Sequence, residues 1–136
     1  MTLTNHDKVE IRELVSRYNK TMDTADPDGW VETFTDDGEF VGVTGTFRGT
    51  DELRAFAVRH ATEASYAEYA AAQHWVTNLV IEGDGDDATM FSHLMMVRPE
   101  DGRGVIILLG QYNDTLRRVD GQWRFVQRVI TADLHP

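Results

Sequence analysis

Cysteine is absent from the 136 residues of this chain. Its absence excludes disulfide bonds, thiolate ligands for metal ions and cysteine nucleophiles, and it is typical of proteins in a reducing compartment. Proline is scarce, with three residues, and no linker, repeat or low-complexity segment divides the sequence. Because the length is close to the most common size of one domain, we predict a single domain over residues 1–136.

Basic residues are few: 13 Lys and Arg stand against 23 Asp and Glu, which gives a formal net charge of −10. Such a charge repels the phosphates of nucleic acids and anionic lipids, so we expect neither nucleic acid nor membrane as a partner. Long apolar segments are missing as well. The longest run, Val105–Leu109, is too short to cross a bilayer, and the start of the chain lacks the apolar centre of a signal peptide. We therefore expect a cytoplasmic protein.

The beginning of the sequence predicts two helices. Thr4 is placed to cap the first helix, with Asp7 three residues later, and apolar residues then recur at steps of three and four up to Met22. A proline disfavours helical geometry in the residue before it and is well tolerated in a first helical turn. The first helix should therefore end near residues 23–26, and a second helix should span Pro27–Phe34.

The next segment predicts a turn at residues 36–38 and a hairpin over residues 39–43 and 46–48. Thr50 is then placed to cap a third helix. The buried face of that helix is predicted to consist of Leu53, Phe56, Ala57 and His60. Residues 61–72 either continue the third helix or form a covering loop.

The rest of the chain predicts an antiparallel meander of four strands, separated by turn sequences rich in Gly and Asp. The strands are expected at residues 73–82, 88–98, 103–116 and 122–131. Large apolar residues occupy both alternating sets of positions, so both faces of the sheet should be covered. The order of elements predicts an α+β fold, a cone-shaped barrel in which three N-terminal helices pack on a strongly curved, mostly antiparallel sheet.

Polar side chains share strand faces with apolar ones. Strand alternation places His74 and Asn78 on one face together with two valines, and Tyr112 and Arg128 also have apolar neighbours on their strands. This arrangement suits either a buried hydrogen-bond network or a ligand pocket. No HExxH motif or paired-histidine spacing indicates a metal site.

Several motifs follow one another along the whole chain in an order found in a known family. They are Tyr18, Asp23, Asp26 and Trp30 with Phe34-Thr35-Asp36-Asp37-Gly38, then Arg48-Gly49-Thr50-Asp51-Glu52-Leu53, His74, Asn78, Gly110-Gln111-Tyr112-Asn113-Asp114, and Asp120-Gly121-Gln122-Trp123-Arg124-Phe125 with Arg128. In these motifs the sequence resembles SnoaL-like domains of the nuclear transport factor 2-like superfamily. That superfamily contains dehydratases, dehydrochlorinases, ketosteroid isomerases and polyketide cyclases, and also binding and assembly domains without catalysis.

The resemblance implies roles for particular residues. In the dehydratase and dehydrochlorinase branch, an aspartate at the end of the first helix orients a histidine on the first meander strand, and Asp23 and His74 match these positions. Tyr18 matches a catalytic tyrosine, and Arg128 matches a pocket arginine. Trp30, Asn78 and Tyr112 are further candidates for contact with a substrate. Two departures from scytalone dehydratase, at His93 and Tyr112, put that particular reaction in doubt, and the resemblance also implies a homodimer or higher homo-oligomer.

The chemistry of such a pair is general. A neutral histidine with one free ring nitrogen accepts a proton near neutral pH, and a carboxylate on the other nitrogen fixes the tautomer. We therefore predict a cofactor-independent lyase or isomerase for a largely apolar, cyclic or polyketide-like small molecule. Two alternatives stay open: a non-catalytic binding protein with the same pocket, and a dimeric assembly domain. Arg128 is either a pocket group or a buried partner of Asp114, and His93 either lines the cavity or points outward.

Overall fold

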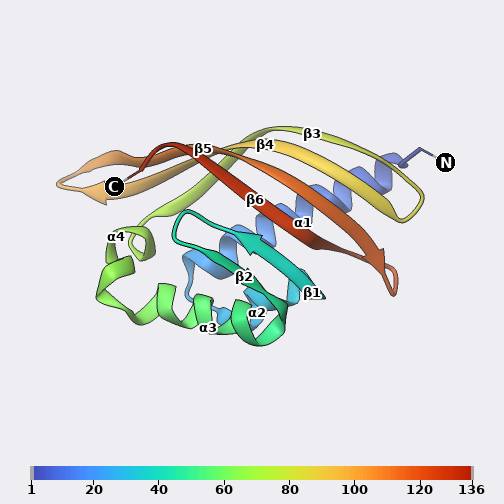
Figure 1. The fold of residues 1–136 in the computed structure, drawn as a ribbon. Helices are drawn as coiled ribbons and strands as arrows, with labels where there is room; N and C mark the ends of the chain where they lie inside the picture. The colour runs from blue at the N-terminus through green and yellow to red at the C-terminus, as the bar shows by residue number, and fades with distance from the viewer. Residues whose placement is uncertain (1, 136) are drawn as a thin grey trace.

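The computed structural model describes residues 2–135, so Met1 and Pro136, the two ends of the predicted domain, lie outside the described residues. Three helices lie in the first half of the chain: α1 spans Asn5–Asp23, α2 spans Pro27–Glu32, and α3, which follows the first two strands, spans Gly49–Thr62. Figure 1 shows that the helices lie on one side of the sheet, with α1 running along it and α3 below its first strands.

The expected start of α1 is confirmed. Thr4 Oγ1 accepts a hydrogen bond from the backbone N–H of Asp7 at 3.0 Å, and Asp7 Oδ2 accepts one from the backbone N–H of Thr4 at 2.9 Å. Asp7 Oδ1 also accepts hydrogen bonds from Arg118 Nη1 at 2.8 Å and Trp123 Nε1 at 3.3 Å. One carboxylate therefore caps the helix and ties its first turn to the last hairpin of the sheet.

The sheet has six strands in the order β2-β1-β6-β5-β4-β3. They are β1 (Phe34–Val41), β2 (Thr46–Arg48), β3 (Gln73–Asp84), β4 (Asp87–Glu100), β5 (Arg103–Val119) and β6 (Gln122–Leu134). β1 runs parallel to β6, and all other neighbours are antiparallel. The predicted α+β class, with N-terminal helices on a mostly antiparallel sheet that ends in a four-stranded meander, is confirmed; the strong curvature stays a prediction.

The turn predicted at residues 36–38 is wrong. These residues lie inside β1, and the helix expected to reach Phe34 ends at Glu32. The pairing of β1 with β6 shifts in register between Phe34 and Glu39. The Asp-Asp-Gly sequence therefore forms an irregular part of a strand, because tertiary pairing overrides its local preference for a turn.

The cap predicted for α3 is also wrong: the helix begins at Gly49, one residue before Thr50, with Arg48 as its N-cap. The alternatives for residues 61–72 are resolved as well. After α3 ends, a short 3₁₀-helix η1 (Ala64–Tyr66) and a single-turn helix α4 (Ala67–Ala70) lead into β3. Neither of these two short elements contains a buried residue. We call residues 64–70 the covering segment.

A cluster of aromatic side chains joins the helices to the sheet. Trp30 of α2 is fully buried, with its ring centroid 5.7 Å from that of Tyr18 and 5.0 Å from that of Phe34. Phe56 of α3 packs 5.6 Å from Trp30. These rings hold the three helices against the inner face of the sheet, and burying such large apolar surfaces stabilises the fold.

The other face of the sheet is not covered by helices (Figure 1). Trp75 on β3 is 54% exposed, and Ile106 and Leu109 on β5 are 46% and 39% exposed. The prediction that both faces are covered is therefore wrong for the isolated chain. Within residues 2–135, none of the helices is long and apolar enough to span a membrane.

Candidate active site

The structure brings Asp23 and His74 together from positions 51 residues apart. His74 Nδ1 lies 2.6 Å from Asp23 Oδ1, and the backbone N–H of His74 donates to Asp23 Oδ2 at 3.0 Å. One carboxylate thus holds both the ring and the backbone of the histidine, which fixes the ring and favours the proton on Nδ1. Nε2 has no hydrogen-bond partner within residues 2–135, so its lone pair can accept a proton.

Tyr18 and Asp23 of α1 point in different directions. On a continuous helix, Tyr18 and Asp23 would point about 140° apart. Asp23 is the last residue of α1, and the chain then turns through Thr24 and Ala25, which has a φ of 55°. Tyr18 contributes to the wall of a pocket beside His74, whereas Asp23 lies behind the imidazole and is not part of that wall. Asp23 can therefore act on a ligand only through His74.

The pocket beside His74 has a volume of about 50 Å³ and lies between α1, α3, the covering segment and the inner face of the sheet. Most of its wall is apolar, with side chains such as Met22, Phe40 and Leu94. The titratable side chains in the wall are Tyr18, His60, Tyr66, Tyr69, His74 and Tyr112. An apolar lining with a few converging polar groups is typical of a site for a small organic molecule, whereas the volume is well below the roughly 300–1,000 Å³ of such sites.

Two of these tyrosines are almost fully buried. Tyr18 and Tyr112 are each 1% exposed, and their rings meet edge to face with centroids 6.4 Å apart. Burial raises the pKa of Tyr18 and raises the pKa of Tyr112 well above its usual value, although the positive charge of Arg128 opposes both shifts. Both hydroxyls therefore stay protonated at neutral pH and can donate hydrogen bonds.

Arg128 lies beneath the tyrosines and does not line the pocket. Its guanidinium carbon is 4.4 Å from the ring centroid of Tyr18 and 3.5 Å from that of Tyr112, and Nε donates to Asp114 Oδ1 at 3.0 Å. Both side chains of the Arg128–Asp114 pair are 0% exposed. Of the two roles left open for Arg128, the structure shows the buried partner of Asp114.

Burial raises the pKa of Asp114 to about 6, even though Arg128 favours its charged form. Arg128 Nη1 and Nη2 and Asp114 Oδ2 have no hydrogen-bond partner within residues 2–135. The pair therefore places polar atoms without hydrogen-bond partners in the core, beside the two tyrosine rings.

His60 is a pocket residue that the sequence assigned only to the buried face of α3. It is 6% exposed and shares the pocket wall with His74. Burial lowers the pKa of His60 to about 4, and His74 acts in the same direction while Asp23 opposes it. The signal in the sequence was a histidine at helical spacing from Leu53, Phe56 and Ala57 on a buried face, which gives no indication of a cavity.

Three other candidates do not line this pocket. Trp30 is packed in the core and is not part of the pocket wall, so its contact with a substrate stays a prediction. Asn78 is exposed, because a bulge in β3 gives it a φ of 60° and shifts the pairing with β4 between Thr77 and Val80. The prediction that Asn78 shares a face with His74 is therefore wrong. His93 is exposed on the uncovered face of the sheet.

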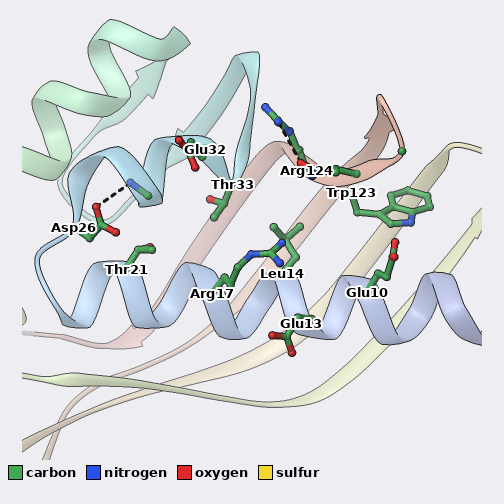
Figure 2. Close-up of a pocket in the computed structure, with 13 residues that line it drawn as sticks. Glu10, Glu13, Leu14, Arg17, Thr21, Asp26, Glu32, Thr33, Trp123 and Arg124 are labelled. Atoms are coloured by element: carbon green, nitrogen blue, oxygen red, sulfur yellow. Dashed lines mark hydrogen bonds between the residues drawn. The ribbon is translucent and has the colours of Figure 1, made fainter.

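A larger groove of about 620 Å³ lies between α1, α2 and the turn that joins β5 to β6. Figure 2 shows Glu10, Glu13 and Arg17 of α1 on one side of it and Glu32 and Arg124 on the other. Glu13, Arg17 and Glu32 are exposed to solvent. The groove holds charged groups of both signs but no buried catalytic pair, so the smaller pocket at His74 is the better candidate for an active site.

Comparison with known proteins gives a family and several related structures. The family of SnoaL-like domains matches residues 4–129. A protein of unknown function with a cystatin-like fold from Nostoc punctiforme is 32% identical, with a TM-score of 0.87 over 98% of this chain and 96% of that one. A variant of Rv3472, of unknown function, from Mycobacterium tuberculosis is 33% identical, with a TM-score of 0.83 over 94% of this chain and 72% of that one.

A putative scytalone dehydratase from Novosphingobium aromaticivorans is 22% identical, with a TM-score of 0.79 over 95% of this chain and 85% of that one, which shows a common fold. The search of curated proteins gave no match to this sequence. Helices on one face of a mostly antiparallel six-stranded sheet define the nuclear transport factor 2-like class of folds. Within that class, the chain belongs to the family of SnoaL-like domains.

Proposed function

We propose that the protein is a cofactor-independent lyase or isomerase that removes a proton from a carbon atom next to a carbonyl group, with His74 as the general base. The observation that carries this proposal is the 2.6 Å contact between His74 Nδ1 and Asp23, which leaves Nε2 unpaired at an apolar pocket. The superfamily supports it, because it includes dehydratases and dehydrochlorinases.

In the proposed step, His74 Nε2 takes the proton of the substrate C–H bond, and the electron pair of that bond moves into the carbonyl group to form an enolate. Asp23 stabilises the imidazolium that results. Return of the proton at another carbon gives isomerisation, and departure of a β-hydroxyl group with a proton gives elimination of water. A histidine base of this kind contributes about 10²–10⁴-fold to the rate.

The negative charge on the enolate oxygen needs stabilisation. Tyr18 and Tyr112 keep their protons because burial raises the pKa of both, so their hydroxyls are suitable donors. The Arg128 guanidinium lies against both rings. Donors held ready for a developing oxyanion in a poorly hydrated site make one of the largest contributions to catalysis.

The pocket has to open further to admit such a substrate. Its 50 Å³ is about one third of the roughly 150 Å³ hollow that accommodates benzene in another protein. The covering segment contains no buried residue, and its polar side-chain contacts are few and near the surface: Tyr66 Oη lies 2.9 Å from Thr44 Oγ1, and Glu68 pairs with Arg98 at 2.6 Å. We propose that this segment moves outward when a ring-shaped substrate enters.

The test uses β-tetralone, a bicyclic ketone with acidic C–H bonds beside its carbonyl group. In heavy water, abstraction of one of these protons and delivery of a deuteron from solvent replaces C–H by C–D. Proton NMR detects this exchange as a loss of signal, even when no new compound is formed. The parent protein is expected to accelerate this exchange, and His74→Gln is expected to lower the protein-dependent rate by about 10²–10⁴-fold.

The matched control is His6→Gln, which removes a histidine that is 79% exposed on α1 and should leave the rate unchanged. Equal rates in the parent and His74→Gln would rule out the proposed base. If neither protein accelerates exchange but both bind β-tetralone with the same affinity, the alternative of a non-catalytic binding protein is correct.

We also propose that the uncovered face of the sheet pairs with a second copy of the chain. Its exposed apolar side chains are Trp75, Val80, Ile106, Leu109 and Leu134. Two copies related by a twofold axis would bury this patch on both sides, which agrees with the assembly implied by the family. Light scattering should give a molar mass of about twice the 15.4 kDa of the chain. Ile106→Lys should halve the measured mass, whereas Val9→Lys, at an exposed site on α1, should leave it unchanged.

A further inference from the structure

We propose that His60 is a second residue that contacts the substrate. Its ring N–H donates a hydrogen bond to the carbonyl oxygen of the substrate, and the C–H bond next to that carbonyl group faces His74. The substrate class that follows is a flat cyclic ketone or its enol, held between two imidazoles. This inference rests on the proposed function, and it adds a residue and a substrate geometry to it.

The position of His60 is the first support. It lies in the last turn of α3, and its ring centroid is 6.0 Å from that of Phe56 and 5.8 Å from that of Tyr66. These aromatic contacts fix the ring in the pocket wall that it shares with His74. The two imidazoles come from α3 and β3, so a bound molecule can meet both of them at once.

The hydrogen-bonding state of His60 is the second support. A neutral imidazole has one donor nitrogen and one acceptor nitrogen. No hydrogen bond joins either ring nitrogen of His60 to another residue in the range 2–135, and neither nitrogen is among the fully buried side-chain atoms that lack a partner. Both nitrogens therefore keep accessible surface, although the side chain as a whole is only 6% exposed. The ring N–H is free to donate a hydrogen bond to a ligand oxygen in the pocket.

The electrostatic surroundings separate the two histidines. Asp23 contacts the ring of His74 directly, whereas no carboxylate among residues 2–135 is hydrogen-bonded to the ring of His60. The pKa of His60 is about 4, so the imidazole is neutral at pH 7. One of its ring nitrogens still carries a hydrogen atom that it can donate in a hydrogen bond. A neutral imidazole that polarises a carbonyl group, working beside a separate base, is an established combination in enzymes.

β-Naphthol is the probe for this inference, because it is a stable aromatic analogue of the enol of β-tetralone. Naphthalene has the same ring system without the oxygen, so the ratio of the two dissociation constants measures the contribution of the hydroxyl group. This is a binding measurement on the intact protein that needs no proton transfer. It therefore stays informative even if His74 proves not to be a base.

The expected result in the parent protein is that β-naphthol binds at least about tenfold more tightly than naphthalene, since a satisfied hydrogen bond to a buried group has about this value. In His60→Phe, which keeps an aromatic ring and loses the donor, the preference should fall below about twofold with naphthalene affinity unchanged. His60→Gln keeps an amide donor and should retain part of the preference, and His6→Phe, at an exposed site on α1, should retain all of it.

A full preference for β-naphthol in His60→Phe would overturn the inference and would assign the oxygen contact to the tyrosines. Equal affinities for the two probes in the parent protein would also overturn it. If His60→Phe does not fold, the ring N–H proton of His60 in the parent protein provides the second measurement. That proton should move downfield when β-naphthol binds and stay in place with naphthalene; no difference between the probes counts against the inference.

Discussion

Replacing His60 with glutamine is expected to remove much of the acid sensitivity of folding. The pKa of His60 is lowered from 6.5 to about 4, because burial penalises the imidazolium and His74 repels it. Below pH 6.5 the folded protein therefore binds fewer protons at this residue than the unfolded chain does. The stability contributed by neutral His60 is fully present above about pH 6.5 and is lost as the pH falls towards about 4.

The two pKa values give the magnitude. Between pH 7 and pH 5, a histidine titrating at 6.5 in the unfolded chain and at about 4 in the folded protein loses about 2 kcal/mol of stability. The ionisable groups around His60 are Asp23, Asp26, Tyr66, Tyr69 and His74. They are the same in the parent and in His60→Gln, so they contribute to both proteins.

Asp114 has the opposite effect, because its pKa is raised to about 6 and its protonation favours the folded state as the pH falls. For this reason the free energy of unfolding of the variant is compared with that of the parent at each pH. The change in one protein between two pH values would mix the effects of His60 and Asp114. Asp114 is present in both proteins and cancels in the difference.

The assay is urea unfolding at pH 7 and at pH 5, followed by the fluorescence of the three tryptophans. Between the two pH values, His60→Gln should lose about 2 kcal/mol less stability than the parent. The control His6→Gln, at a histidine that is 79% exposed on α1, should behave as the parent does. A parallel loss of stability in the parent and in His60→Gln would show that His60 is not buried in a neutral form, and the reasoning would be wrong.

Three further changes have defined outcomes. Arg128→Met leaves the Asp114 carboxylate buried without its partner and should cost about 3–5 kcal/mol in urea unfolding at pH 8; adding Asp114→Asn should recover part of that loss, and no recovery would contradict the pairing. Thr4→Ala removes one half of the capping box and should lower the unfolding free energy by about 1 kcal/mol. The control is Thr2→Ala, which removes a hydroxyl group outside the capping box. Gly110→Ala would place a Cβ 2.5 Å from the carbonyl oxygen of Thr131, so thermal unfolding should show a loss of about 1–3 kcal/mol, and an unchanged midpoint would contradict this close approach.

The fold was predictable because its elements carry local signals. Thr4 and Asp7 mark the start of α1, Pro27 marks the start of α2, and Gly- and Asp-rich turns separate the strands of the meander. The local signals were misleading where pairing with another strand decides the conformation, as in residues 36–38. The uncovered face of the sheet was not predicted, because the positions of apolar residues along a strand show that a face is apolar but do not show what covers it.

The candidate site was predictable only in part. The contact between Asp23 and His74 came from a family resemblance, since nothing local relates two positions 51 residues apart. Asn78 was misplaced because strand alternation fails after a β-bulge, and no residue near it signals that bulge. The role of His60 depends on the space beside a buried helix face, which exists only once α3, β3 and the covering segment have been brought together.

The most direct test of the central claim is the nitrogen NMR spectrum of the His74 imidazole at neutral pH in the ligand-free protein. We expect a proton on Nδ1, held by Asp23, and an unprotonated Nε2 whose nitrogen signal shifts when β-naphthol binds. A neutral His74 that instead carries its proton on Nε2 would have no lone pair to offer a substrate, and that result would contradict the proposed proton transfer.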